Sequence, residues 1–589
     1  MRKKIDALLM RLKFDPWFDY SETYEQNLGL VSIATYCKKK NLNVLVLNEP
    51  HITFELLNNI LKVERIGVLG FYCDADNIHM TLSMINLLKD KHPKLICVTG
   101  GPQVSAIPWD KKIVTESKCD FAVRGEGEKP FSNIVYFVNF GKPRVDEISG
   151  TSYISNGKFR RNPDSSLLDP REMPVPDRTL TYFPSIPTGT EIIYTAKGCP
   201  YHCAFCSEGA IGQMYRMRDT ADVVSEVENL LKTRNLRYML IMDDIFTLNA
   251  NRVLELVTKF KELQQKYHQF YWYCEGRANI IRENPGIIKP MIDSGLIRLQ
   301  IGIESGSQGI LDKYGKALTL DDIRETVKLC YDEGLTSLVG NFIVGGPFET
   351  LDTLGESVKF AKELLELAPG CLDLNVAIYS PYPSTEMYLK PEQFGIEMLD
   401  RECITGSTMQ YVFTRTKELT KWDLLRAKDD FTQEIESKAL LLVQFIPHER
   451  ITRHFGAFYN IGMNSMWHRA ISKISRYNNY FSSIVCEEKK TLNDVADNIN
   501  LYKPLRTLPI KEALNDEIIL TVEGDRKIGF SQLSSRIFEL CSGKLTTSQI
   551  VSILYDENKG KIDQIVLEKY MLNFFGMLDR EKLVVFSEI

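Results

Sequence analysis

Three cysteines stand close together in the run Lys197-Gly-Cys-Pro-Tyr-His-Cys-Ala-Phe-Cys-Ser-Glu208. They are Cys199, Cys203 and Cys206. Three thiolates at this spacing can hold a four-iron cluster and leave one iron without a protein ligand. Such a cluster is suited to chemistry at its open iron as well as to electron storage.

Other uses of these cysteines are less favoured. A structural zinc site takes four ligands, often as two separated pairs, and no second cysteine pair follows at suitable spacing. His202 could complete a zinc set, but it adjoins Cys203 and is expected to point elsewhere. A disulfide needs an oxidising compartment, and the first residues, interrupted by Asp6, Arg11 and Lys13, do not form a secretory signal peptide. We therefore expect a cluster rather than zinc or inert core cysteines.

Size and composition favour a multidomain protein of the cytoplasm. The chain has 589 residues, so we expect at least two domains and favour three. With 44% hydrophobic and 25% charged residues it has an ordinary globular composition, and no apolar run is long enough to cross a bilayer. The formal charge of −5 gives no basic field for nucleic acid. The remaining cysteines are scattered singly, which suits a reducing compartment; they include Cys37, Cys97, Cys330, Cys371 and Cys541.

Residues 1–140 alternate apolar runs with helical patterns. The runs lie at 5–10, 44–47, 66–71, 96–99 and 121–123, and they predict βαβ units with a parallel sheet. Two glycine turns follow the later runs, Gly100-Gly101-Pro102 and Gly125-Glu126-Gly127-Glu128. Such turns let the backbone approach a ligand closely, although tight strand-to-helix turns alone would explain them equally well.

Residues 141–188 are predicted to be a linker. The part from 163 to 187 has many turn formers and little periodicity. A short hairpin is expected at 152–160, because Asn156-Gly157 is a strong two-residue turn signal.

From residue 189 to 390 the strand and helix rhythm resumes. Six parallel strands are predicted, beginning at Ile192 and then at 238–242, 270–274, 297–302, 337–344 and 374–379, and they suggest a partial (β/α)6 barrel. Sites in such folds gather at the carboxyl ends of the strands. The polar and glycine residues at these ends are Asp243, Asp244, Glu275, Arg277, Glu304, Ser305, Asn341, Gly345, Gly346 and the segment 379–383.

Some of these residues have structural explanations too. Asp243 and Asp244 could each cap a helix, since Asp is a preferred N-cap. Arg277 could bind a carboxylate of a cofactor or substrate, or it could pair with Glu275.

The cysteine spacing, placed just after the apolar run at 191–196, resembles that of the radical S-adenosylmethionine (SAM) superfamily. The resemblance implies that Cys199, Cys203 and Cys206 bind a [4Fe–4S] cluster whose open iron is chelated by SAM. Reduction then cleaves SAM to a 5′-deoxyadenosyl radical. The resemblance also implies contacts from Asp243 and Asp244 to the SAM amino group, from Glu304 and Ser305 to its ribose or methionine part, and from the Gly345 turn to its adenine. Arg277 is kept as a candidate for the SAM carboxylate, with the alternatives given above.

The first 140 residues resemble the cobalamin-binding domain that precedes many radical SAM domains. The resemblance rests on the segment 27–30 and the two glycine turns, and it implies cobalamin contacts from Gly100, Gly101, Gln103, Gly125, Glu126 and Gly127. One departure is that the loop 13–19 lacks the histidine with which other cobalamin proteins ligate cobalt. The loop after the third strand, with Tyr72, Cys73 and Asp74, is then the candidate for the lower cobalt face. His51 and His79 are alternatives, with a surface role favoured for both.

The remaining sequence divides into a helical region, 391–510, and a distinct module, 511–589. No motif marks the helical region, for which ordinary packing is favoured over a substrate lid. The module is predicted to hold two short strands, at 517–522 and 526–530, and three helices, with Gly543 ending the first and Thr546 or Thr547 capping the second. This order predicts a winged-helix-like module.

The module resembles the PqqD-like RiPP recognition element, which binds the leader of a ribosomally made precursor peptide by adding it to a sheet edge. The resemblance rests on 537–544 and on the last helix with the following 583–585. A DNA-binding winged helix is the rival, but the few basic residues are mixed with Glu539, Asp556 and Asp563.

Together these resemblances imply a cobalamin-dependent radical SAM methyltransferase that acts on a precursor peptide. In that family one SAM methylates cobalt(I), and the radical from a second SAM abstracts hydrogen from an unactivated carbon, which then takes the methyl group from methylcobalamin. Placement of the reactants is the main task of the protein. A flavodoxin or ferredoxin is the expected electron donor. The alternatives are a radical cyclisation or epimerisation without methyl transfer, a small-molecule substrate, and a non-enzymatic cobalamin or redox sensor.

Overall fold

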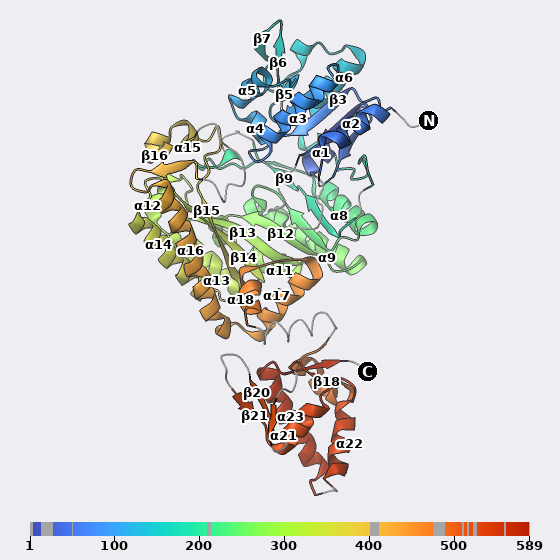
Figure 1. Ribbon diagram of the computed structural model, residues 1–589, viewed down its shortest axis with the longest axis vertical. Coiled ribbons are helices and arrows are strands. Elements are labelled where there is room, and N and C mark those ends of the chain that lie inside the picture. Colours follow the sequence, from blue (N-terminus) through green and yellow to red (C-terminus); the bar gives the residue numbers. More distant parts are fainter. Residues whose placement is uncertain are drawn as a thin grey trace. The chain divides into compact units, whose positions relative to one another are not determined.

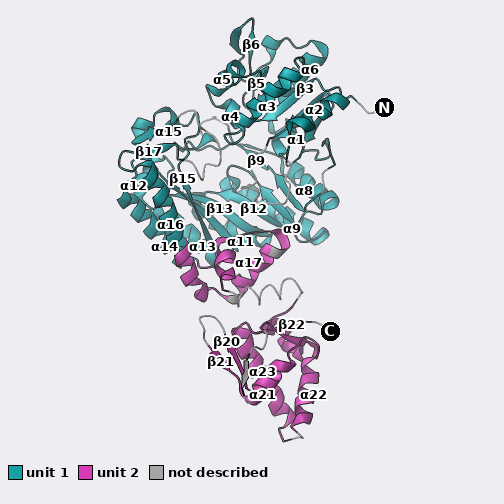
Figure 2. Cartoon of the chain, viewed as in Figure 1, with its two compact units in different colours: residues 1–368, 372–435 teal, residues 369–371, 436–589 magenta. Residues whose placement is uncertain are grey.

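The computed structural model describes residues 4–12, 27–49, 51–184, 187–208, 214–400, 412–474, 489–508, 512–514, 517–521, 527–558 and 561–587. The chain divides into two compact units, one of residues 1–368 and 372–435 and the other of residues 369–371 and 436–589 (Figure 2). No helix within the described ranges has the length and apolar character needed to cross a membrane.

The first unit begins with a seven-stranded sheet in the order β2-β1-β3-β4-β5-β6-β7 (Figure 1). The first five strands are parallel, as expected: β1 (Ala7–Met10), β2 (Val44–Leu47), β3 (Val68–Tyr72), β4 (Ile96–Gly100) and β5 (Phe121–Val123). The intervening helices are α1 (Leu28–Lys39), α2 (Phe54–Val63), α3 (Ile78–Lys91), α4 (Pro102–Ser105), α5 (Trp109–Glu116) and α6 (Glu128–Phe140).

Both faces of this sheet are buried. In β1, Leu8 and Met10 join one hydrophobic cluster, whereas Ala7 and Leu9 join another, as alternation along a strand requires. The first cluster includes residues of α2, α3 and α5, and the second includes residues of α1 and α6. Helices on both faces of a parallel sheet make this a Rossmann-like domain, with a candidate ligand site at the carboxyl ends of its strands.

The segment predicted as a linker contributes to the same sheet. β6 (Thr151–Ser155) pairs antiparallel with β5, and β7 (Lys158–Arg161) pairs antiparallel with β6. The predicted hairpin turn is present, with positive φ at Asn156 (51°) and Gly157 (70°). The hairpin therefore belongs to the sheet, because its first strand completes the open edge of β5.

The second part of the first unit is an open six-stranded parallel sheet in the order β15-β14-β13-β12-β11-β8. Its outer strands do not pair with each other, so the barrel is partial, as predicted. The strands are β8 (Thr190–Ile193), β11 (Tyr238–Ile241), β12 (Tyr271–Gly276), β13 (Leu296–Glu304), β14 (Ser337–Val344) and β15 (Leu372–Ile378). The helices are α8 (Thr220–Arg234), α9 (Ala250–Lys266), α10 (Ala278–Glu283), α11 (Ile288–Asp293), α12 (Gln308–Lys313), α13 (Leu320–Asp332) and α14 (Leu351–Leu367).

The helical region includes a short ribbon and several helices. The long helix α16 packs on the barrel through Phe431, whose ring centroid lies 5.1 Å from that of Phe342 in β14. In the second unit Trp467 is fully buried, which agrees with ordinary helical packing. The elements are α15 (Glu386–Leu389), β16 (Ile396–Met398), β17 (Thr414–Thr416), α16 (Lys421–Leu442), α17 (His448–Ile461), α18 (Met466–Ser472) and α20 (Leu492–Val495).

The C-terminal module combines a three-stranded antiparallel sheet with three helices. Thr546 caps α22 through the backbone N–H of Gln549, as expected, but β19 was not predicted. β22 pairs antiparallel with β18, outside the three-stranded sheet. The elements are β18 (Lys503–Arg506), β19 (Glu512–Leu514), β20 (Glu517–Thr521), β21 (Lys527–Gly529), α21 (Gln532–Leu540), α22 (Thr547–Glu557), α23 (Gln564–Arg580) and β22 (Val584–Ser587).

Candidate functional site

The three cysteines lie between the two strands of a short antiparallel ribbon. β9 (Ala196–Lys197) precedes them and β10 (Arg216–Met217) follows them. Each cysteine side chain is partly exposed and none is in a disulfide. Within the described ranges no three His, Cys, Asp or Glu side chains are arranged to hold a metal ion, so the cluster ligands stay a prediction.

The middle of the cysteine loop is anchored to the barrel. The backbone N–H of Ala204 donates to the carbonyl of Tyr314 at 2.9 Å, and the N–H of Met387 donates to the carbonyl of Ala204 at 3.1 Å. The Ala204 side chain is buried, whereas those of Cys203 and Cys206 are partly exposed. The loop is thus fixed at its centre and presents cysteines on either side of that point.

Asp243 and Asp244, at the end of β11, hold the backbone that leads into this loop. Asp243 is 1% exposed and accepts hydrogen bonds from the N–H groups of Thr195 (2.6 Å) and Ala196 (3.0 Å). Burial raises the pKa of Asp243 to about 6, and these hydrogen bonds oppose the rise. Asp244 accepts from the N–H of Gly198 at 2.8 Å. Both carboxylates therefore support the loop, and direct contact with SAM stays a prediction.

Arg277 touches the cysteine loop rather than Glu275. One guanidinium nitrogen lies 3.7 Å from Cys203 Sγ, and the guanidinium carbon lies 3.8 Å from the centre of the Tyr201 ring. Arg277 is 8% exposed and also donates to the Lys316 carbonyl. The carboxylate of Glu275 instead accepts hydrogen bonds from Tyr273 and Gln300. The structural alternative weighed for Arg277, a pair with Glu275, is thus not what the structure shows.

Glu304 forms a buried ion pair with Lys316 near the same loop. Its φ of 64° is in the left-handed region, which is uncommon for a residue other than glycine and turns its side chain at the end of β13. A Cβ at Gly302 would overlap the ends of both charged side chains, so a larger residue there would make the ion pair shift. Ser305 is fully buried, and its hydroxyl oxygen lies 3.2 Å from that of Ser357. The same hydroxyl accepts a hydrogen bond from the backbone N–H of Ser307.

The glycine turn after β14 is held by the carboxylate of Glu349, which no sequence pattern indicated. Glu349 is 1% exposed and accepts from the N–H groups of Gly345 and Gly346. Burial raises the pKa of Glu349 to about 7, although the two hydrogen bonds favour the charged carboxylate and lower the pKa. Gly345 has a φ of 88°, which explains why the turn needs glycine. The carboxylate therefore fixes the turn expected near the adenine of SAM.

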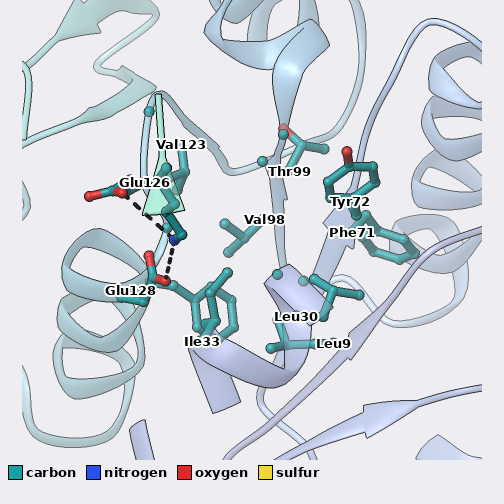
Figure 3. Close-up of a pocket in the computed structure, with 18 residues that line it drawn as sticks. Leu9, Leu30, Ile33, Phe71, Tyr72, Val98, Thr99, Val123, Glu126 and Glu128 are labelled. Atoms are coloured by element: carbon teal, nitrogen blue, oxygen red, sulfur yellow. Dashed lines mark ion pairs between the residues drawn. The ribbon is translucent and has the colours of Figure 1, made fainter. Parts of the chain in front are cut away.

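A cavity of about 180 Å³ opens at the carboxyl ends of the strands in the N-terminal sheet (Figure 3). Its walls are mostly apolar, and they include Leu9, Leu30, Ile33, Val98 and Val123. Of the residues predicted to contact cobalamin, Tyr72, Gly100, Gly101, Gly125, Glu126 and Gly127 line it.

The glycines shape the walls of this cavity in two ways. At Gly70 a Cβ would meet Leu9 at 2.5 Å and Phe131 at 2.8 Å, so glycine allows close packing there. At Gly100 a Cβ would meet nothing nearer than 3.8 Å, and at Gly125 nothing within 4 Å. Glycine at position 100 therefore leaves room for a ligand, whereas the φ of 71° at Gly125 favours glycine there whatever the space.

The other predicted cobalamin residues lie elsewhere. Cys73 is fully buried, and burial raises the pKa of its thiol well above the usual value. Asp74 is paired with Arg11 at 2.7 Å. Gln103 is 3% exposed, and its amide nitrogen has no hydrogen-bond partner among the described residues. With Asp74 and Glu208 it lines a second cavity of about 240 Å³. The loop 13–19 lies outside the described residues.

Several site residues were missed because only the folded chain reveals their partners. Lys197 and Arg216, on the ribbon, pair with the turn at Glu126, and Lys316 pairs with Glu304. The position of Lys197, two residues before Cys199, was a signal that could have been used.

Two family models match the chain. The radical SAM superfamily model matches residues 193–361, and the B12 binding domain model matches residues 19–135. A relative described as an uncharacterized methyltransferase, PH0819 of Pyrococcus horikoshii, is 29% identical over 374 residues, which is 61% of this chain and 77% of the relative.

Two solved structures share the fold. The cobalamin-dependent SAM radical enzyme OxsB, solved with aqua-cobalamin and SAM, has a TM-score of 0.59 at 14% identity and covers 97% of this chain and 84% of its own. The radical SAM methyltransferase TsrM of Kitasatospora setae, solved with tryptophan and a SAM analogue, has a TM-score of 0.56 at 16% identity and covers 76% of this chain and 90% of its own.

These comparisons agree with the architecture described above. The chain is an α/β protein with an N-terminal B12-binding domain and a radical SAM domain. The two domains imply a [4Fe–4S] cluster, SAM and cobalamin as cofactors. In these two domains the chain is similar to cobalamin-dependent radical SAM enzymes and to methyltransferases.

Proposed function

We propose that this enzyme transfers a methyl group to an unactivated carbon of a ribosomally made precursor peptide. The observation that carries the proposal is the direct contact between the two cofactor regions, because Glu126 beside the apolar cavity pairs with Arg216 on the cysteine-loop ribbon at 2.8 Å. When bound, the cluster with SAM supplies a 5′-deoxyadenosyl radical, and cobalamin supplies the methyl group.

The residues of both regions fit these cofactors. The cavity is apolar and its glycines leave space at Gly100 and Gly125, which suits a flat apolar group such as the benzimidazole of cobalamin. Cys199, Cys203 and Cys206 share one loop and are partly exposed, so their thiolates are accessible to iron. Burial raises the pKa of Cys199, while a hydrogen bond from the Tyr201 N–H and the charge of Arg277 oppose the rise.

The chain's own contribution is placement. Asp243 and Asp244 fix the start of the cysteine loop, Tyr314 fixes its middle, and Glu349 fixes the turn after β14. A radical transfer needs little acid–base work, so holding the reactants in one orientation is the main task of the protein. We place the enzyme in the cytoplasm, where thiols stay reduced and a flavodoxin or ferredoxin can deliver low-potential electrons.

The C-terminal module supports a peptide substrate. Its three-stranded sheet in the order β19-β20-β21, followed by α21, α22 and α23, suits recognition by strand addition. Within the described residues β21 has a partner strand on one side only. Phe530 donates its N–H to Ile518 of β20, and backbone groups alternate along a strand, so the N–H of Gly529 points to the open side.

Two exposed side chains of α23 lie on the helix that packs against the start of α21, just after β21. Val566 of α23 is 58% exposed, and Tyr570, one turn later, is 38% exposed. The Tyr570 hydroxyl lies 2.8 Å from that of Ser534 and 3.2 Å from that of Ser531, two residues after β21. A peptide strand paired with β21 would therefore have an apolar helix surface next to it for its alternate side chains.

The test is anaerobic purification with iron and cobalamin, then incubation with SAM, a reductant and the precursor peptide encoded nearest the gene. Retained corrinoid and a peptide heavier by one methylene support the proposal. A peptide that loses hydrogen or keeps its mass while deoxyadenosine forms shows a different radical reaction. Leader recognition is overturned if the enzyme methylates a small molecule, or the core peptide without its leader, as fast as it methylates the whole precursor.

A further inference from the structure

The glycine turn at the cobalamin cavity is bonded to both strands of the ribbon that carries the cysteine loop. Lys197 of β9 lies 3.7 Å from Glu126 and 3.6 Å from Glu128, measured from Nζ to carboxylate oxygens. These are the dashed contacts in Figure 3. Arg216 of β10 binds Glu126 through two nitrogens, at 2.8 and 3.2 Å. The loop between Lys197 and Arg216 therefore starts and ends on residues held by one turn.

The ribbon geometry aims both cations at the turn. Lys197 and Arg216 are directly opposite each other in the antiparallel pair, so their side chains lie on the same face. Glu126, Glu128 and Arg216 are each less than 9% exposed at the side chain, and Lys197 is 26% exposed. Charge pairs with so little solvent interact strongly and tolerate the loss of a partner poorly.

The same turn is also part of the cavity wall. Gly125, Glu126, Gly127 and Glu128 all line the cavity, and so does Lys197 itself. Glu128 is further fixed by a hydrogen bond of 2.8 Å from Ser32 of α1. A ligand that fills the cavity therefore contacts the residues whose charged groups hold the cysteine loop in place.

We propose that Glu126, with Arg216 and Lys197, couples cobalamin binding to the order of the cluster loop. Cobalamin that fixes the turn fixes both ends of the loop, and by thermodynamic reciprocity an assembled cluster strengthens cobalamin binding. These three are positioning residues, since they act through the backbone of the turn and the loop. The inference rests on the proposed function in that it requires both cofactors to bind.

The test measures iron release from the anaerobically reconstituted enzyme to a ferrous chelator, with and without saturating hydroxocobalamin. In the wild type we expect cobalamin to slow release by about fivefold or more, within the usual range of coupling between two sites. In Glu126→Gln, and separately in Lys197→Met, this ratio should fall towards one although the corrinoid spectrum shows that cobalamin is bound. Lys197→Met keeps the apolar stem in the cavity wall and removes only the charge.

A matched control is Glu191→Gln. Glu191 is 5% exposed and binds Arg178 (3.1 Å) and Arg234, so its loss removes a comparable buried ion pair in the barrel. We expect this variant to keep the wild-type ratio. The inference is overturned if Glu126→Gln and Lys197→Met keep the ratio, if Glu191→Gln loses it equally, or if cobalamin binds the wild type without slowing iron release. Failure of the wild type to bind any corrinoid would instead overturn the proposed function.

Discussion

Asp243 accepts a hydrogen bond of 2.6 Å from the backbone N–H of Thr195, across the junction between β11 and the cysteine loop. The same oxygen accepts from Ala196 at 3.0 Å, and Arg252 donates to the Thr195 hydroxyl at 2.9 Å. A fully buried carboxylate thus fixes the chain three residues before the first cysteine. The two aspartates at this strand end therefore hold the backbone that leads into the cysteine loop, which their position in the sequence did not indicate.

Asp243→Asn should remove a pH-dependent penalty on stability. The pKa of Asp243 is raised to about 6 in the folded protein, whereas an unfolded aspartate titrates near 4, so the folded state favours the protonated form. Its contribution to stability is fully present below pH 4 and is lost as pH rises through 6. Urea unfolding of the apo-protein measures this effect. From pH 4 to pH 8, the free energy of unfolding of the variant should rise by up to about 3 kcal/mol relative to that of the wild type.

Asp243→Ala is the comparison that tests the hydrogen bonds. Asparagine keeps an acceptor for Thr195 and Ala196, but alanine leaves both N–H groups unpaired at about 1–3 kcal/mol each. We expect iron loading near wild type in the asparagine variant and clearly lower in the alanine variant. Equal iron content in both, or equal pH profiles for wild type and Asp243→Asn, would contradict this role.

Arg277→Met should shift the reduction potential of the cluster to more negative values. The guanidinium lies 3.7 Å from Cys203 Sγ and is 8% exposed, and a positive charge beside a cluster ligand favours the reduced, more negative state. The measurement is a redox titration followed by electron paramagnetic resonance. The control Arg282→Met removes an exposed arginine of α10 that pairs with Asp322 and Glu325, and the potential of this variant should match the wild type. An unchanged potential in Arg277→Met would show that the contact does not act on the cluster.

Much of the fold could be predicted from local patterns. Buried parallel strands read as short apolar runs, and all five predicted strands of the first sheet and all six of the second are present. The Asn156-Gly157 turn was also correct, because its signal lies in two adjacent residues.

Pairings between distant segments could not be predicted in this way. The addition of β6 to β5 and the bond between Glu126 and Arg216 depend on which segments meet after folding. β19 is only three residues long, which gives no periodicity to detect. Glu349 was missed for a similar reason, since nothing in its neighbours shows that it is buried against Gly345 and Gly346.

Gly100→Leu should weaken cobalamin binding while the cobalamin-free enzyme still assembles its cluster. Gly100 lines the apolar cavity, and a Cβ there would be in ordinary contact with Val123, at 3.8 Å, so the added side chain occupies cavity space at little cost to the backbone. We expect at least about a tenfold loss of affinity in a spectral titration, equivalent to about 1.4 kcal/mol. Gly100→Ala should have a smaller effect, and both variants should match the wild type in iron content when they are reconstituted without cobalamin. Wild-type affinity in Gly100→Leu would place the cobalamin site elsewhere.

Gly529→Pro should abolish leader-peptide binding by the module while leaving its sheet intact. Proline removes the N–H that points to the open side of β21, whereas the pairing of Phe530 with Ile518 uses other groups. Among the described residues no atom lies within 4 Å of a Cβ built at Gly529, so that carbon has space. Gly529→Ala keeps the N–H and should bind the peptide normally in a fluorescence anisotropy titration with the full-length enzyme. Equal binding by both variants would contradict strand addition at β21.

Electron paramagnetic resonance of the anaerobically reconstituted, reduced enzyme tests the central claim most directly. If Cys199, Cys203 and Cys206 hold a [4Fe–4S] cluster with an open iron, the reduced protein gives the signal of one such cluster, and SAM alters that signal by binding to the iron. Replacing any of the three cysteines by alanine should abolish it. A protein that contains zinc in place of iron, or a cluster signal that SAM leaves unchanged, would contradict the account.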